Sequence, residues 1–213
     1  MPAFTQPRIG GPPPVLPVLP SGGGDDPEQS GRGATRSASM IGMIVLMCAS
    51  TMTFGALIAA MILRRSLNND WHSMPVPRLL WWNTAGLVVS SVAFDVARRL
   101  LAKNRRALFN WYWGAGSLLG TLFLIGQILA WRELYARGYF LAGGLATAFF
   151  YVITWTHALH VVGAIAAVYY VEFRALRFEL GPSRRTMVAV SALFWHFLDV
   201  MWLCIMALFA WWA

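Results

Sequence analysis

Long apolar runs, separated by short polar and basic segments, dominate the sequence from residue 40 onward. Each run has about the 20 apolar residues that cross a hydrocarbon core of roughly 30 Å. A chain in lipid must pair its backbone polar groups internally, so runs of this kind form helices. The pattern predicts an all-α, polytopic bundle of five transmembrane helices, at about residues 40–63, 79–101, 107–131, 141–171 and 186–212.

The first 38 residues follow a different pattern. They hold eight of the eleven prolines and seven glycines, including the runs Gly-Pro-Pro-Pro and Gly-Gly-Gly. Such a segment cannot bury enough apolar surface to offset its ordering entropy. Pro17 interrupts its short apolar stretch, which argues against a signal peptide. We expect residues 1–38 to be a disordered cytoplasmic tail and residues 39–213 to form the membrane domain.

Composition agrees with a membrane protein and excludes an ordinary cytosolic domain. Of the 213 residues 58% are hydrophobic and 12% charged, with a mean hydropathy of +0.55. Soluble domains carry about 25% charged residues. The net charge of +8 comes from basic residues placed between the apolar runs, which argues against nucleic-acid binding. Cys48 and Cys204 lie inside apolar runs and belong to no metal or redox motif.

The distribution of Lys and Arg predicts the orientation. Eleven flank the side that holds the amino terminus, the 98–106 loop and the 174–185 loop, against five on the other side. The positive-inside rule therefore places the amino terminus in the cytoplasm and the carboxyl terminus in the periplasm. Anionic lipid headgroups are the expected ligands of the basic pairs on the first side, which are Arg98, Arg99, Arg105, Arg106, Arg184 and Arg185.

Four ionisable side chains fall near the middle of the predicted spans. His157 and His160 are three residues apart on the fourth helix, and His196 and Asp199 repeat this spacing on the fifth. Buried ionisable groups in a membrane are costly, so they call for a partner or a function. Three interpretations are open: an interhelical hydrogen-bond cluster, a proton relay, or a metal or haem site.

The fifth helix carries a specific signature, Phe194-Trp195-His196-Phe197-Leu198-Asp199-Val200-Met201-Trp202. It resembles the aromatic-Trp-His-Phe-x-Asp-x-x-Trp segment of subunit III of haem-copper terminal oxidases, the cytochrome c oxidase subunit III family. The segment from His157 to Gly163 resembles that family's His-Gly-Leu-His-Val segment. Asn83 on the second helix and Gln127 on the third also match, so that the resemblance covers about residues 40–212, in the bacterial five-helix form.

The resemblance implies an accessory subunit with no redox centre of its own. It would support proton uptake by catalytic subunit I, stabilise that subunit and bind phospholipid. Haems and copper would lie on partner subunits I and II, within a complex or a respiratory supercomplex in the bacterial inner membrane. The isolated chain would not be catalytic, and removing it would impair the complex without abolishing its haem spectrum.

Three positions depart from the family pattern. Glutamates often found in the family are replaced here by Thr51, by Ala130 and, at the start of the last helix, by Ala189 or Val190. These losses leave open a quinol oxidase subunit or a subunit-III-like partner of nitric oxide reductase. An independent membrane cytochrome that uses the buried histidines, and a small proton-coupled transporter, are the competing hypotheses from other classes.

Overall fold

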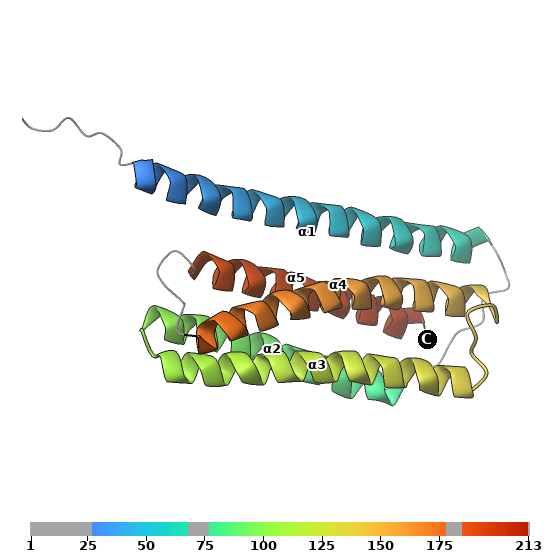
Figure 1. Cartoon of the computed structure of the whole chain (residues 1–213). Helices are drawn as coiled ribbons and strands as arrows, with labels where there is room; N and C mark the ends of the chain where they lie inside the picture. Colours follow the sequence, from blue (N-terminus) through green and yellow to red (C-terminus); the bar gives the residue numbers. More distant parts are fainter. Residues whose placement is uncertain (1–26, 68–76, 178–184, 213) are drawn as a thin grey trace, which may run out of the picture.

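A computed structural model describes residues 27–67, 77–177 and 185–212, and it shows five helices and no strand within these ranges (Figure 1). The helices are α1 (Pro27–Leu67), α2 (Arg78–Ala102), α3 (Arg106–Ala136), α4 (Leu145–Leu176) and α5 (Arg185–Trp212). The predicted all-α class and the number and order of the helices are confirmed.

Four of the five helices are long and apolar enough to cross a membrane, namely α1 from Ala38 onward, α3, α4 and α5. The second helix is not among these four candidate spans. It is 25 residues long, or about 37 Å at 1.5 Å per residue. Its polar side chains, among them Thr84, Ser90 and Ser91, are buried against other helices. These polar side chains of α2 therefore lie at contacts between helices and not on the outside of the bundle.

The largest difference between predicted and observed helix boundaries is at the start of α1. The first helix begins at Pro27, not at about residue 40, so residues 27–38 are helical and the predicted disorder is wrong there. Seven of the tail's eight prolines precede residue 27, and no proline follows until residue 75. Proline is tolerated at a first helical position, and the apolar span supplies the nucleus that polar residues extend. Residues 1–26 lie outside the described part.

The ends of α3 and α4 also shift. The third helix continues past Trp131 to Ala136, and an ion pair between Glu133 and Arg137 closes its last turn. Gly138 follows with φ +87°, a left-handed backbone conformation that ends helices and that glycine adopts without strain. The fourth helix then begins at Leu145 instead of residue 141, because the turns that include Gly143 and Gly144 come first.

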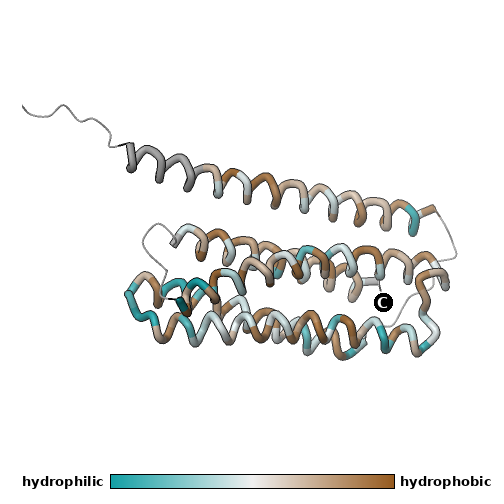
Figure 2. Tube along the Cα trace, in the orientation of Figure 1, coloured by the Kyte–Doolittle hydropathy of each residue, from teal (hydrophilic) through white to brown (hydrophobic). Residues whose placement is uncertain are grey.

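The helices α2 to α5 pack into one bundle, and α1 lies along its side (Figure 1). The first helix contacts α4 and α5, and only 11% of its apolar window is buried, against 44–50% for α3, α4 and α5. Its buried side chains Ser50, Phe54 and Met61 mark the contact face. Figure 2 shows brown apolar positions along the helices and teal hydrophilic positions gathered at the turn between α2 and α3.

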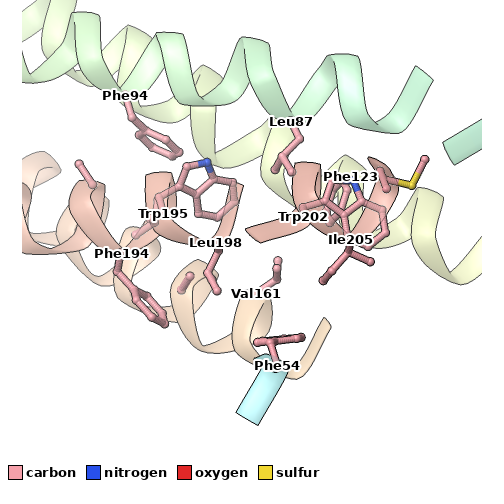
Figure 3. Packing of buried hydrophobic residues seen from close by; sticks show 14 of the residues in the cluster. Phe54, Leu87, Phe94, Phe123, Val161, Phe194, Trp195, Leu198, Trp202 and Ile205 are labelled. Atoms are coloured by element: carbon pink, nitrogen blue, oxygen red, sulfur yellow. The ribbon is translucent and has the colours of Figure 1, made fainter. Parts of the chain in front are cut away.

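Three buried hydroxyl groups of the apolar helices form hydrogen bonds within their own helix. Thr84, Ser117 and Thr154 each donate to the carbonyl oxygen four residues earlier, at 2.7–2.9 Å. This bond lets a polar side chain lie in an apolar environment without an unpaired donor. The core between the helices combines aromatic and aliphatic side chains, and Trp113 is fully buried in it. Figure 3 shows two further fully buried rings, those of Phe94 and Trp202.

Candidate functional site

The signature segment of α5 turns one face toward the middle of the bundle (Figure 3). Trp195, Leu198 and Trp202 are 0–2% exposed, and their spacing of three and four residues places them on one side of the helix. Phe197 is half-buried, and its ring is stacked on that of Phe194 with a centroid distance of 6.3 Å. The two tryptophans of the signature are therefore core residues that join α5 to the other helices.

Trp202 makes both polar and aromatic contacts. Its Nε1 donates to Thr84 Oγ1 on α2 at 3.0 Å. Its ring meets the Phe123 ring edge-to-face at 5.1 Å and the His157 ring at 4.9 Å. One side chain thus links α5 to α2, α3 and α4, and its Nε1 supplies a hydrogen-bond donor that phenylalanine lacks.

Two glycines of α3 allow aromatic rings to approach closely, Gly120 the ring of Trp195 and Gly116 the ring of Phe94. A Cβ on Gly120 would lie 2.3 Å from Trp195 Cη2, and one on Gly116 would lie 2.9 Å from the Phe94 ring. Both contacts are too short for any side chain, so only glycine permits the close approach. The Phe94 and Trp195 rings in turn meet edge-to-face at 5.2 Å.

Asn83 on α2 and Gln127 on α3 differ in their hydrogen bonding. Asn83 Nδ2 donates to the Phe123 carbonyl oxygen at 2.7 Å, and its side chain lies over Gly126, where a Cβ would approach Asn83 Oδ1 to 2.3 Å. Gln127 is 1% exposed, and neither polar atom of its amide group has a hydrogen-bond partner among the described residues.

His157 is completely buried among aromatic rings. The rings of Phe54, Phe123 and Trp202 surround it with centroid distances of 6.1, 6.2 and 4.9 Å. Neither Nδ1 nor Nε2 has a hydrogen-bond partner in the described part of the chain. Unpaired buried polar atoms are uncommon in folded proteins and call for an explanation.

His160 does not join His157 in the core, although both residues contact α1. The His160 Nδ1 donates to the Thr156 carbonyl oxygen at 2.8 Å, and its ring lies 5.4 Å from that of Phe54. The side chain is half-buried. Its own helix therefore satisfies this histidine, and the ring faces the boundary between α1 and α4.

Asp199 and His196 lie on the α2 side of α5. Asp199 is 7% exposed, with the Ser91 hydroxyl and the His196 ring beside it. Ser91 Oγ and Asp199 Oδ1 still lack a hydrogen bond of normal geometry. His196 is half-buried, and the charged side chains nearest to it are Arg98, Asp95 and Asp199.

The four predicted residues thus do not meet as one cluster. The structure brings His157 and Asp199 to the walls of one narrow pocket, while His160 turns to α1 and His196 to α2. No group of three or more His, Cys, Asp or Glu side chains is close enough to bind a metal ion within residues 27–67, 77–177 and 185–212. Within the described residues, His157 packs against rings of α1, α3 and α5, and His160 forms its hydrogen bond within α4.

The basic residues named as lipid-binding candidates lie near one end of the bundle. Arg99 forms an ion pair with Asp95 at 2.7 Å, both side chains being partly exposed. Arg98 is half-buried near His196, and Arg105 and Arg106 are exposed at the turn between α2 and α3. Arg184 lies outside the described residues, and Arg185 is the first residue of α5.

The positions that lack the family glutamates differ in their surroundings. Thr51 is exposed on α1 and donates to the Met47 carbonyl oxygen at 2.8 Å. Ala130 is fully buried on α3, whereas Ala189 and Val190 are half-buried on α5.

Three side chains of this region were not picked out as site residues from the sequence. Phe54 covers both histidines of α4, Thr84 accepts the bond from Trp202, and Ser91 lies beside Asp199. The paired serines at 90 and 91 interrupt an otherwise apolar stretch, which is a detectable signal. Phe54 gives no such signal, since phenylalanine is common in apolar helices.

The chain also matches a known protein family. The model of the family "Cytochrome c oxidase subunit III" matches residues 35–213. The chain belongs to that family. The match includes all five helices and begins within α1, eight residues after Pro27.

Curated members of the family resemble the chain over most of its length. The cytochrome c oxidase subunit 3 of Thermostichus vulcanus is 30% identical over 177 residues, which cover 79% of this chain and 85% of the relative. A probable cytochrome c oxidase subunit 3 of Nocardia farcinica is 28% identical and covers 78% and 84%. The cytochrome bo(3) ubiquinol oxidase subunit 3 of Pseudomonas putida is 27% identical over 128 residues, or 57% of this chain and 59% of the relative.

Proposed function

We propose that this protein is the accessory subunit III of a proton-pumping haem-copper terminal oxidase that accepts electrons from cytochrome c. The observation that carries the proposal is the family match over residues 35–213. Relatives named as cytochrome c oxidase subunits also align with 78–79% of this chain and with 84–85% of their own length. The complex would reduce oxygen in the bacterial inner membrane, with haems and copper on subunits I and II.

Two features support a role without a redox centre on this chain. The ring of His157 is enclosed by aromatic side chains, so a haem would have to displace Phe54, Phe123 or Trp202 to reach it. His160 uses its Nδ1 within its own helix. These side chains brace α4 against its neighbours, and the electron-carrying groups belong to the partner subunits.

The orientation of the chain in the membrane and the crossing by α2 form part of the same proposal. We infer that α2 crosses the membrane inside the bundle, shielded by its neighbours, and that the amino terminus faces the cytoplasm. The helices alternate in direction, so the turn at Lys103–Arg105 and the basic end of α4 lie at the same end of the bundle (Figure 1). Along the sequence, eleven Lys and Arg residues flank the spans on that side, which supports a cytoplasmic location, where Arg98, Arg105 and Arg106 would meet anionic headgroups.

A quinol oxidase is the second candidate, and the similarity to the Pseudomonas putida subunit favours it over a nitric oxide reductase. The partner subunits that accompany this chain distinguish the two.

The test is purification of the tagged full chain from its native membranes in a mild detergent, with a reduced-minus-oxidised spectrum and identification of the proteins. We expect a large haem- and copper-bearing subunit to co-purify, and the separated chain to be colourless. An untagged strain is the control. Recovery of the chain alone, or a haem spectrum from the chain alone, would contradict the proposal.

Deletion of the gene provides a second readout. We expect the haem spectrum of the membranes to persist. We expect the oxidase activity to fall, and the enzyme to lose activity sooner during turnover. Loss of the haems on deletion would show a role in assembly of the redox centres and would overturn the accessory role.

A further inference from the structure

A half-buried histidine lies far inside the apolar span of α5. His196 comes ten residues after Thr186, where that span begins, and 15 residues before Trp211, where it ends. At 1.5 Å per residue these intervals are about 15 and 22 Å, which places the residue within a hydrocarbon core of roughly 30 Å. Unlike the fully buried ring of His157, this side chain is partly open to the outside of the bundle.

His196 lies at the seam where α2 and α5 meet. Its ring is close enough to Arg98, Asp95 and Asp199 to interact with them electrostatically, but within the described residues it forms no hydrogen bond with any of the three. Ionisable side chains inside membrane spans almost always face the interior of a bundle or a water-filled cavity. A histidine that is partly open to the outside at this depth therefore indicates that more than lipid covers the α2–α5 seam.

We propose that the outer side of the α2–α5 seam binds a transmembrane helix of a partner subunit, and that this helix presents an acidic side chain to His196. The inference rests on the proposed function, because the partner is a subunit of the oxidase complex. It adds which face of this chain forms the contact and which chemistry the partner helix brings to it.

The charges at the seam favour an acidic partner. Arg99 forms an ion pair with Asp95 at 2.7 Å, which neutralises that carboxylate. No ion pair of Arg98 is found in the part of the chain that the structure describes. Asp199 is 7% exposed beneath this surface, so the outward side of the seam carries one positive charge in excess. A partner carboxylate complements this charge and accepts a hydrogen bond from the His196 ring.

A phospholipid headgroup does not supply the contact at His196. Headgroup phosphates lie outside the hydrocarbon core, whereas His196 lies within it. Arg98 comes only four residues before Ala102, the last residue of α2, or about 6 Å along the helix. Its guanidinium has five N–H donors, so it can bind a headgroup phosphate at the membrane surface and the partner carboxylate below it.

Aliphatic side chains extend the same face along both helices. Their spacing of three and four residues from Asp95 and His196 places them on one side of each helix. The exposed members are Val88 and Val92 on α2 and Val200 and Leu203 on α5. A partner helix can pack against these side chains, while the single polar contact at His196 fixes its position along the seam.

Photo-cross-linking in native membranes tests the contact surface directly. A benzophenone amino acid replaces Val92 or Val200 in separate variants of the tagged full chain. We expect both variants to cross-link to a haem-bearing subunit on irradiation. The comparison position is Leu159, which is 72% exposed on α4 and not part of the seam. Cross-links from Leu159 with none from Val92 and Val200 would overturn the proposal, and so would cross-links from the seam to lipid alone.

Substitution of His196 tests the polar contact. We expect His196→Leu to raise the apparent dissociation constant for the haem-bearing subunit in mild detergent by about threefold, the effect of one interhelical hydrogen bond in a membrane protein. His196→Gln keeps a side-chain N–H and should bind more tightly than His196→Leu. The matched control is His160→Leu, because the His160 ring bonds within its own helix. Unchanged binding by His196→Leu, or equal weakening by His160→Leu, would contradict the proposal.

The outcomes separate this proposal from the oxidase role. If the chain co-purifies with a haem-bearing subunit but neither seam position cross-links to it, the oxidase role stands and the docking face is wrong. If no such subunit co-purifies, both are wrong. The cross-links are made with His196 intact, so they decide the question if the His196 variants do not fold.

Discussion

The indole Nε1 of Trp202 donates to the hydroxyl of Thr84 at 3.0 Å, and this bond joins α5 to α2 across 118 positions of sequence. Thr84 is 8% exposed and Trp202 is fully buried. Thr84 Oγ1 in turn donates to the Leu80 carbonyl oxygen at 2.7 Å. One hydroxyl thus receives a bond from the signature tryptophan and gives one to its own helix.

Thr84→Val should destabilise the bundle, because it keeps the side-chain shape but leaves the Trp202 N–H buried and unpaired. We expect a loss of about 1 kcal/mol, the usual size of an interhelical hydrogen bond in a membrane protein. Thermal unfolding of the purified protein in detergent measures it. The matched control is Thr53→Val, whose exposed hydroxyl bonds only to Ala49 in the same helix. Equal losses in both variants would refute the role of the interhelical bond.

Gly120→Ala should lower the stability of the protein by more than the addition of one methyl group suggests. The new Cβ would lie 2.3 Å from Trp195 Cη2, so the indole must move within a close-packed core. Overpacking of this kind costs typically about 1–3 kcal/mol. Gly163→Ala is the control, since a Cβ there meets nothing within 4 Å. A melting temperature of Gly120→Ala as high as that of the control would contradict the close approach of α3 and α5.

Gly126→Ala and Asn83→Ala should be coupled. A Cβ at position 126 would approach Asn83 Oδ1 to 2.3 Å, and shortening Asn83 removes that obstacle. We expect the double variant to be no less stable than Asn83→Ala alone, although Gly126→Ala by itself destabilises. Melting temperatures of the four proteins provide the measurement. Simple additivity would indicate that the two positions are not in contact.

Arg99→Gln should have little effect on stability. Its ion pair with Asp95 is between partly exposed side chains one turn apart on the same helix. Such pairs contribute about 0.3–0.5 kcal/mol. We expect a shift in melting temperature close to the error of the measurement, in contrast to Thr84→Val. A loss as large as that of Thr84→Val would show that the pair supports more than its own helix.

Cysteine labelling tests the proposed orientation and the span of α2. Arg78→Cys and Lys103→Cys place thiols at the two exposed ends of α2, with Cys48 and Cys204 replaced by serine and alanine. In spheroplasts, a membrane-impermeant maleimide should label position 78 at once and position 103 only after permeabilisation. The reverse result would invert the orientation, and labelling of both at once would show that α2 does not cross.

The sequence predicted the helices to within a few residues at most ends because their length and apolarity are local properties. The five helices, their order and the Trp195–Trp202 signature needed no knowledge of contacts. The start of α1 was missed because composition averaged over residues 1–38 hid the change at Pro27, after which the chain has no proline until residue 75.

The site depended on facts that spacing alone does not contain. His157 and His160 share a helix face by sequence, yet one ring enters the core and the other faces α1. A helix that is apolar all round has no stripe to indicate which side is buried, so its rotation about its own axis is set by its neighbours.

Sequence by itself thus determined a membrane protein of five helices that belongs to the subunit III family. Only the tertiary structure decided that α1 lies at the side of the bundle, that Asp199 shares a pocket with His157, and that Trp202 bonds to Thr84. The physical reason is that helix formation in lipid follows from backbone hydrogen bonding along one segment. Side-chain placement follows from close packing between segments, where single glycines such as Gly120 and Gly126 fix the approach.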